Sequence, residues 1–127
     1  MLSLSQIEYY LNRGDFMGFS MQTEPDYIGW ISLKKRKHNK RIEEVFSINE
    51  RPDLVLEQQQ ILAYPYVLEI CELKKDVYEN EEKLPEASDY KRADVLYFSE
   101  LTDVKEYLRK FDKNLEEIKW MSEIPSF

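Results

Sequence analysis

Cysteine and histidine, the side chains that most often supply nucleophiles and transition-metal ligands, each occur once in this chain, as Cys71 and His38. A structural zinc site needs four such ligands and a catalytic site at least two or three, so no metal site is expected. Cys71 lies in an apolar stretch, where a buried free thiol behaves as a small hydrophobic group. His38 lies in a strongly basic segment that solvent should surround. We therefore expect no Cys–His catalytic pair.

Phosphate-binding and carboxylate chemistry are no better supported by the sequence. Gly14, Gly18 and Gly29 are the only glycines, and they match neither a P-loop nor a dinucleotide-binding fingerprint. No calcium-loop spacing of Asp and Gly appears. The 25 acidic residues must include close pairs, but no spacing singles out one pair for glycosidase-type catalysis. We predict a protein that is not an enzyme and that needs no cofactor.

Basic residues are distributed unevenly along the chain. There are 18 basic and 25 acidic residues, for a net charge of −7, yet residues 34–41 hold six of the basic ones. These six are Lys34, Lys35, Arg36, Lys37, Lys40 and Arg41. The rest of the chain, with 12 basic and 25 acidic residues, should repel nucleic acid at long range. Residues 34–41 are therefore either a phosphate-binding tip or a solvated turn whose lysines protect a sheet edge.

Acidic residues gather in a second segment, residues 74–90. A loop of this length is unusual in a compact domain and is often functional or mobile, so we expect an acidic, mobile loop. Its tyrosines would anchor an interface while its carboxylates steer the approach of a partner. The predicted contact residues are Asp76, Tyr78, Glu79, Glu81, Glu82, Glu86, Asp89 and Tyr90.

Hydrophobic spacing in the first half of the chain predicts one helix followed by strands. The helix begins at Ser3 or Ser5 and ends at Gly14, where a positive φ is expected. Two strand-like runs, 16–21 and 27–33, flank turn residues that include Pro25. A further strand over 42–48 would make residues 34–41 the tip of a second hairpin.

The second half of the chain contains one ambiguous segment. Pro52 suits the first position of a helix from about residue 52, but a strand over 53–56 is the competing interpretation. Strands are predicted at 66–73 and 93–98. A C-terminal helix begins after Thr102, and its apolar stripe continues to Ile118, so the helix either runs on or breaks at residues 112–114.

Together these elements predict a single α+β domain over residues 1–127. Its core is an antiparallel, meander-like sheet of about four to six strands, with an N-terminal helix and a longer C-terminal helix packed on one face. No apolar stretch approaches the roughly 20 residues that span a bilayer. The single cysteine and the absence of a signal-type start favour a cytoplasmic location.

Two functional hypotheses follow from these observations. The first is a small acidic protein-binding protein, such as a bacterial or phage immunity protein or inhibitor, that occupies a basic surface of one protein partner. The alternative is a nucleic-acid-associated module that uses the basic hairpin tip 34–41 together with Tyr27 and Trp30. No membrane partner is expected under either hypothesis.

Overall fold

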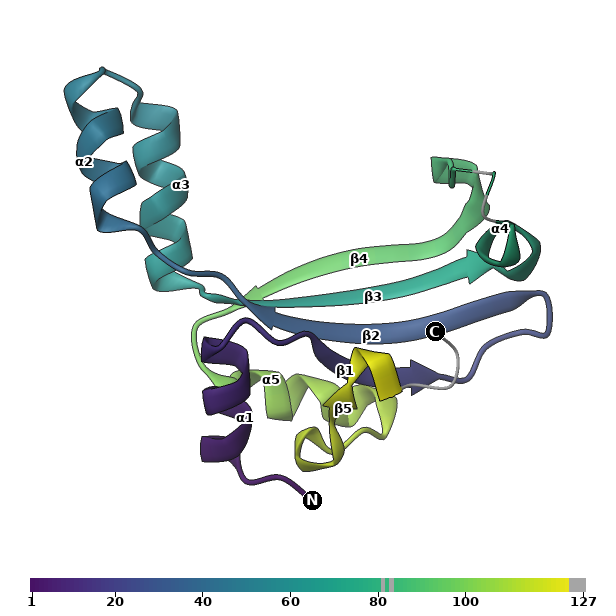
Figure 1. Cartoon of the computed structure of the whole chain (residues 1–127). Coiled ribbons are helices and arrows are strands. Elements are labelled where there is room, and N and C mark those ends of the chain that lie inside the picture. The colour runs from purple at the N-terminus through teal and green to yellow at the C-terminus, as the bar shows by residue number, and fades with distance from the viewer. Residues whose placement is uncertain (81, 83, 124–127) are drawn as a thin grey trace.

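The computed structural model describes residues 1–80, 82 and 84–123, and it places a five-stranded antiparallel sheet at the centre of the molecule (Figure 1). The order of the strands across the sheet is β4-β3-β2-β1-β5. Strands β1 to β4 therefore follow one another as a meander, which confirms the predicted topology. The strands span Met17–Met21 (β1), Tyr27–Lys35 (β2), Tyr66–Lys74 (β3), Tyr90–Phe98 (β4) and Lys119–Trp120 (β5).

One face of the sheet carries the hydrophobic core. Side chains alternate between the two faces of a strand, so Ile31 and Leu33 of β2 lie on the same face as Leu68 and Ile70 of β3. All four are almost completely buried. Helices α1 (Leu4–Asn12) and α5 (Leu101–Leu108) cover this face, as Figure 1 shows. We call the opposite face, which these two helices do not cover, the outer face.

The N-terminal helix has the predicted ends. The Ser3 hydroxyl accepts a hydrogen bond from the backbone N–H of Gln6, and the Gln6 side chain accepts one from Ser3 in return, which is a capping box. The helix ends before Gly14, whose φ of +98° favours glycine. Ile7 and Leu11 of this helix are fully buried in the core.

The C-terminal apolar stripe is divided between a helix and the turns that follow it. The N-cap position of helix α5 is Glu100 rather than Thr102, without a hydrogen bond from its side chain, and the helix continues as a 3₁₀ turn to Phe111. At Asp112 the backbone has a φ of +54°, and this left-handed residue ends the helical path. The chain therefore breaks at the residues that the sequence marked as one alternative, and α5 itself is no longer than α1. Leu115 nevertheless returns to the core and is fully buried.

Residues 40–63 contain two helices, where the sequence predicted a strand at 42–48 and left the segment from residue 52 open between a helix and a strand. Helix α2 spans Lys40–Ile48 and helix α3 spans Pro52–Ala63, and together they project from the sheet as an arm (Figure 1). The predicted strand at 42–48, and with it the hairpin tip at 34–41, is therefore wrong. Asn39 caps α2 by accepting a hydrogen bond from the Ile42 backbone N–H, a start signal that the sequence prediction missed. Pro52 occupies the first turn of α3, as predicted.

The described part of the acidic segment contains regular structure that the sequence did not predict. Helix α4 spans Lys75–Glu79, a 3₁₀ turn covers Ala87–Asp89, and β4 begins at Tyr90 rather than at residue 93. Val77 anchors α4, since its side chain is only 2% exposed. Glu81 lies outside the described residues.

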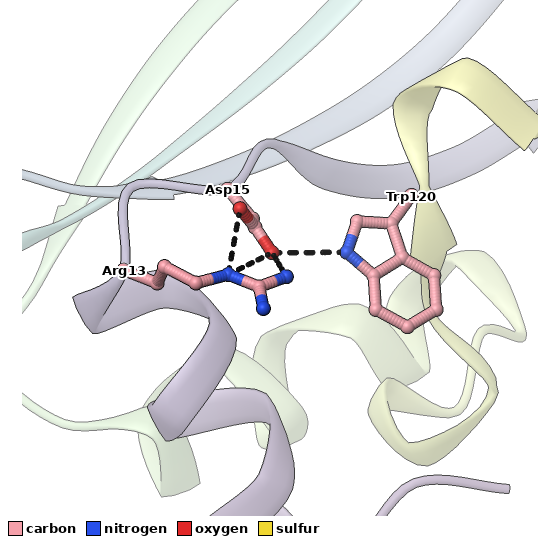
Figure 2. A network of polar contacts seen from close by, with 3 residues as sticks. All are labelled: Arg13, Asp15 and Trp120. Atoms are coloured by element: carbon pink, nitrogen blue, oxygen red, sulfur yellow. Dashed lines mark hydrogen bonds and ion pairs between the residues drawn. The ribbon is translucent and has the colours of Figure 1, made fainter.

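A polar network attaches the last strand to the end of the first helix. Arg13 forms an ion pair with Asp15, and the indole N–H of Trp120 in β5 donates to the same carboxylate at 3.0 Å (Figure 2). These hydrogen bonds, above all the one from Arg13, lower the pKa of the Asp15 carboxyl. Asp15 therefore stays ionised and holds β5 beside β1.

Candidate protein-binding surfaces

Most of the predicted acidic contact residues lie together at one end of the sheet, where β3 ends and β4 begins. Asp76, Glu79, Glu82 and Glu86 are exposed there, and Asp89 is half-buried. Tyr78 and Tyr90 are half-buried in the same region. Glu81, which was also predicted to contact a partner, is not among the described residues, so its contact role stays a prediction.

The β1–β2 loop adds carboxylates that the sequence prediction did not include. The backbone N–H of Lys75 donates to the Asp26 carbonyl at 2.9 Å, and Thr23 donates to the Glu72 carboxylate at 2.5 Å. Lys91 pairs with Glu24 at 2.8 Å. These contacts join the β1–β2 loop to residues that lie 49 to 67 positions further along the chain. We call the combined surface the acidic end; its described carboxylates are Glu24, Asp26, Glu72, Asp76, Glu79, Glu82, Glu86 and Asp89.

Aromatic side chains accompany these carboxylates. The rings of Trp30 and Tyr78 lie 6.4 Å apart, centroid to centroid, which places α4 against the outer face of β2. Tyr27 lies beside Lys91, whose ammonium is 5.6 Å from the ring centroid. Tyr27 and Tyr78 both line a surface depression of about 590 Å³. The acidic end therefore combines a surface depression, aromatic side chains that line it, and an excess of negative charge among the described residues.

The basic residues of segment 34–41 do not form one surface. Lys34 and Lys35 are neighbours at the end of β2, so their side chains point to opposite faces of the sheet. Lys35 pairs with Glu8 of α1, whereas Lys34 lies 3.7 Å from Glu69 of β3. The Arg36 guanidinium stacks on the Tyr97 ring, 4.6 Å from its centroid. It also donates to the Tyr64 carbonyl at 2.7 Å.

Three of the six basic residues are exposed near the base of the arm. Lys37 lies in the loop before α2, and Lys40 and Arg41 begin that helix. These three lie at the opposite end of the sheet from the acidic end, because β2 ends and β3 begins there. The two charged segments that the sequence singles out therefore lie at opposite ends of the strands.

The structure gives the lone cysteine and the lone histidine separate environments. Burial raises the pKa of the Cys71 thiol, and the carboxylates of Glu69 and Asp94 raise it further. A nucleophilic cysteine needs the opposite shift. The His38 ring lies 2.6 Å from the Glu43 carboxylate across the start of α2. Among the described residues, no group of three or more His, Cys, Asp and Glu side chains could hold a metal ion.

No protein-family model, curated protein or solved structure matches this chain. Within the described residues, no helix is long and apolar enough to cross a membrane. The case for a function therefore depends on the geometry of the surfaces described above.

Proposed function

We propose that this protein binds another protein by placing its acidic end on a basic surface of that partner. The observation that carries the proposal is the convergence of the β1–β2 loop and α4, which places Glu24 and Glu79 beside Tyr27 and Tyr78 at one depression. Interfaces are typically anchored by aromatic side chains, while surrounding charges steer association and select the partner. An inhibitor or immunity protein that blocks a basic active site is the role we favour for such a surface.

The distribution of free charge supports this choice over the nucleic-acid alternative. Lys34, Lys35 and Arg36 are each engaged with an acidic, carbonyl or aromatic group of the same chain. Nucleic-acid binding needs several cations free to neutralise phosphates along one surface. Lys37, Lys40 and Arg41 are exposed, as are the carboxylates of Asp26, Glu79 and Glu82. However, eight described carboxylates gather at the acidic end, against these three exposed cations near the base of the arm.

A charge-neutralised variant tests the proposal. The triple variant Asp26→Asn, Glu79→Gln, Glu82→Gln removes three exposed charges from the acidic end. The matched control Glu44→Gln, Glu57→Gln, Glu117→Gln removes the same charge from exposed positions elsewhere. Tagged wild-type protein should recover a basic partner in stoichiometric amount from the lysate of its source cells. This complex should dissociate as salt rises from about 50 to 500 mM, because ions screen exposed charges.

Isothermal titration calorimetry with the purified partner then measures the affinity of each variant. The control should bind like the wild type, and the acidic-end variant should bind at least about tenfold more weakly, a change of roughly 1.4 kcal/mol. Equal affinities for the two triple variants would contradict the proposal. Recovery that disappears after nuclease treatment, and on changing Lys37 and Lys40 to Ala, would favour the nucleic-acid hypothesis instead.

A further inference from the structure

Strand β4 has a long free edge. It is the terminal strand of the sheet, and among the described strands only β3 pairs with it. Its register with β3 shifts at Glu72/Leu73, but from Arg92 to Phe98 the pairing is regular and contains no proline. The other terminal strand, β5, has only two residues. Unpaired backbone N–H and C=O groups along an edge of this length are a template for another strand.

This edge is also unusually apolar for a strand that faces solvent. Val95 is 51% exposed and Tyr97 is 52% exposed. Both line a depression of about 560 Å³ beside the second half of β4, together with Tyr64 from the arm and Tyr107 from α5. Natural edge strands are commonly protected by charge, proline or covering loops. Arg36 stacks on the Tyr97 ring, yet Tyr97 and Val95 both remain about half exposed.

The charges on β4 determine which strand fits this edge. Arg92 and Asp94 lie on the same face of the strand, with Arg92 Nε 2.5 Å from Asp94 Oδ2. In antiparallel pairing of β4 with another β4 about Ala93, Arg92 of each copy lies opposite Asp94 of the other. Pairing about Arg92 or Asp94 instead places like charges opposite each other, which is destabilising. Pairing about Ala93 thus gathers two Arg–Asp pairs into one network of alternating charge.

The charge of the whole molecule favours the same arrangement. The acidic end lies where β4 begins, whereas Arg36 lies where β4 ends, on the ring of Tyr97. Antiparallel pairing places the start of one β4 beside the end of the other. Asp89 of each copy, immediately before β4, then approaches the Arg36 end of its partner. Both the strand and the molecule are therefore complementary in charge to a second copy of themselves.

We propose that the chain forms a twofold symmetric dimer in which β4 pairs antiparallel with β4 of a second copy, with Ala93 at the axis. The two sheets then form one continuous sheet, and the contact is isologous, with the same surface contributed by both copies. The proposed pairing of β4 uses neither Tyr27 nor Tyr78, which line the depression at the acidic end, so this inference does not depend on the function proposed above.

Complementary charge reversals test both the dimer and its register. Sedimentation velocity of the full chain should show a dimer that dissociates on dilution. Arg92→Glu and Asp94→Lys, each alone, create two repulsive contacts across the axis and should weaken the dimer at least about tenfold. An equimolar mixture of these two variants restores opposite charges at both contacts. The mixture should therefore form a heterodimer with near wild-type affinity.

The matched control reverses an exposed ion pair away from the edge. Arg109→Glu and Glu106→Lys change the same types of charge on α5, where the pair is 3.1 Å apart, and should leave the dimer unchanged. Because Arg92 also stacks on the Phe111 ring, circular dichroism must show that each variant is folded. If Arg92→Glu fails to fold, the double variant Val95→Lys, Tyr97→Lys replaces it and should be monomeric.

Three outcomes would overturn the proposal. The first is a wild-type chain that stays monomeric up to millimolar concentration. In that case the free edge of β4 could pair only with a strand of a different protein. The second is a dimer that survives both single reversals, or the double lysine variant, unchanged. The third is a mixture of the folded Arg92→Glu and Asp94→Lys variants that remains monomeric.

Discussion

At the scale of single residues, Gly18 shows how a close backbone approach restricts a position that looks ordinary in the sequence. It lies in β1 opposite Ser32 of β2. A methyl group at Gly18 would overlap the carbonyl oxygen of Ile31 and would lie 2.5 Å from the sulfur of Met121. The side chain of Met121 could move, but the backbone carbonyl could move only with its strand. Glycine is therefore required by the approach of β2, not by a turn.

We predict that Gly18→Ala lowers the free energy of unfolding by at least about 2 kcal/mol, since overpacking of a rigid site typically costs 1–3 kcal/mol or more. Urea denaturation followed by tryptophan fluorescence measures this change. Ser20→Ala, at an exposed position two residues further along β1, is the control and should be nearly neutral. An unchanged unfolding midpoint in Gly18→Ala would show that β1 and β2 can separate without loss.

At the scale of elements, the docking of α1 on the sheet depends on a charged cluster as well as on Ile7 and Leu11. Glu8 of α1 accepts hydrogen bonds from the Lys35 ammonium and from the Tyr66 hydroxyl. Burial opposes ionisation of Glu8, but the hydrogen bonds from Lys35 and Tyr66 outweigh it, so the pKa of Glu8 is lowered. Burial, followed by the Glu8 hydrogen bond, raises the pKa of Tyr66. Tyr66 thus remains a donor at neutral pH.

The lowered pKa of Glu8 predicts how stability changes with pH. A carboxyl group whose pKa is lower in the folded than in the unfolded state stabilises the protein above the unfolded pKa of about 4.5. That contribution is lost as the pH falls through the lowered, folded-state pKa. Glu8→Gln should therefore be less stable than the wild type at pH 7, and the difference should shrink steadily below pH 4.5. Urea denaturation of both proteins between pH 7 and pH 3 measures the difference, and a constant difference would contradict this prediction.

Element types were predicted well where one periodicity dominated. Residues 66–73 formed the expected strand, and residues 4–12 formed the expected helix. Residues 42–48 were predicted wrongly because Ile42, Val45 and Phe46 have helical spacing while Val45 to Ile48 also fits a short strand. The Asn39 cap decides in favour of the helix. The sequence left open whether the helix breaks at residues 112–114, because the apolar stripe continues across them to Ile118.

At the scale of the whole molecule, the arm is an appendage and the sheet is the folding unit. Helix α2 has no buried residue, and α3 has only Ile61. Neither helix contributes to the main hydrophobic core. At the base of the arm the strands are already paired, because the Arg36 backbone N–H donates to the Pro65 carbonyl at 2.7 Å. Residues 36 and 65 therefore lie opposite each other at the ends of two paired antiparallel strands, which a short turn could connect directly.

We therefore predict that replacing residues 37–65 with Asn-Gly-Thr leaves a folded protein. Asn-Gly is the preferred two-residue connection for a hairpin, and the Thr in place of Pro65 supplies the backbone N–H that closes the turn and that proline lacks. The free energy of unfolding should change by less than about 2 kcal/mol, since the shorter connection also lowers the entropy cost of closing the loop. Near-ultraviolet circular dichroism from Trp30 and Trp120 should persist. Loss of that signal or of cooperative unfolding would show that the arm supports the sheet.

The sequence by itself determined the fold class, most element types and the presence of one acidic and one basic segment. Those properties depend on local spacing and composition, which the chain carries wherever it folds. Only the tertiary structure brought Glu24 and Asp26 to the acidic segment, because strand pairing joins residues about fifty positions apart. It also separated Lys34 from Lys35 across the two faces of the sheet and left Arg92–Phe98 at a free edge. The tertiary structure added that the opposite charges occupy opposite ends of the same strands.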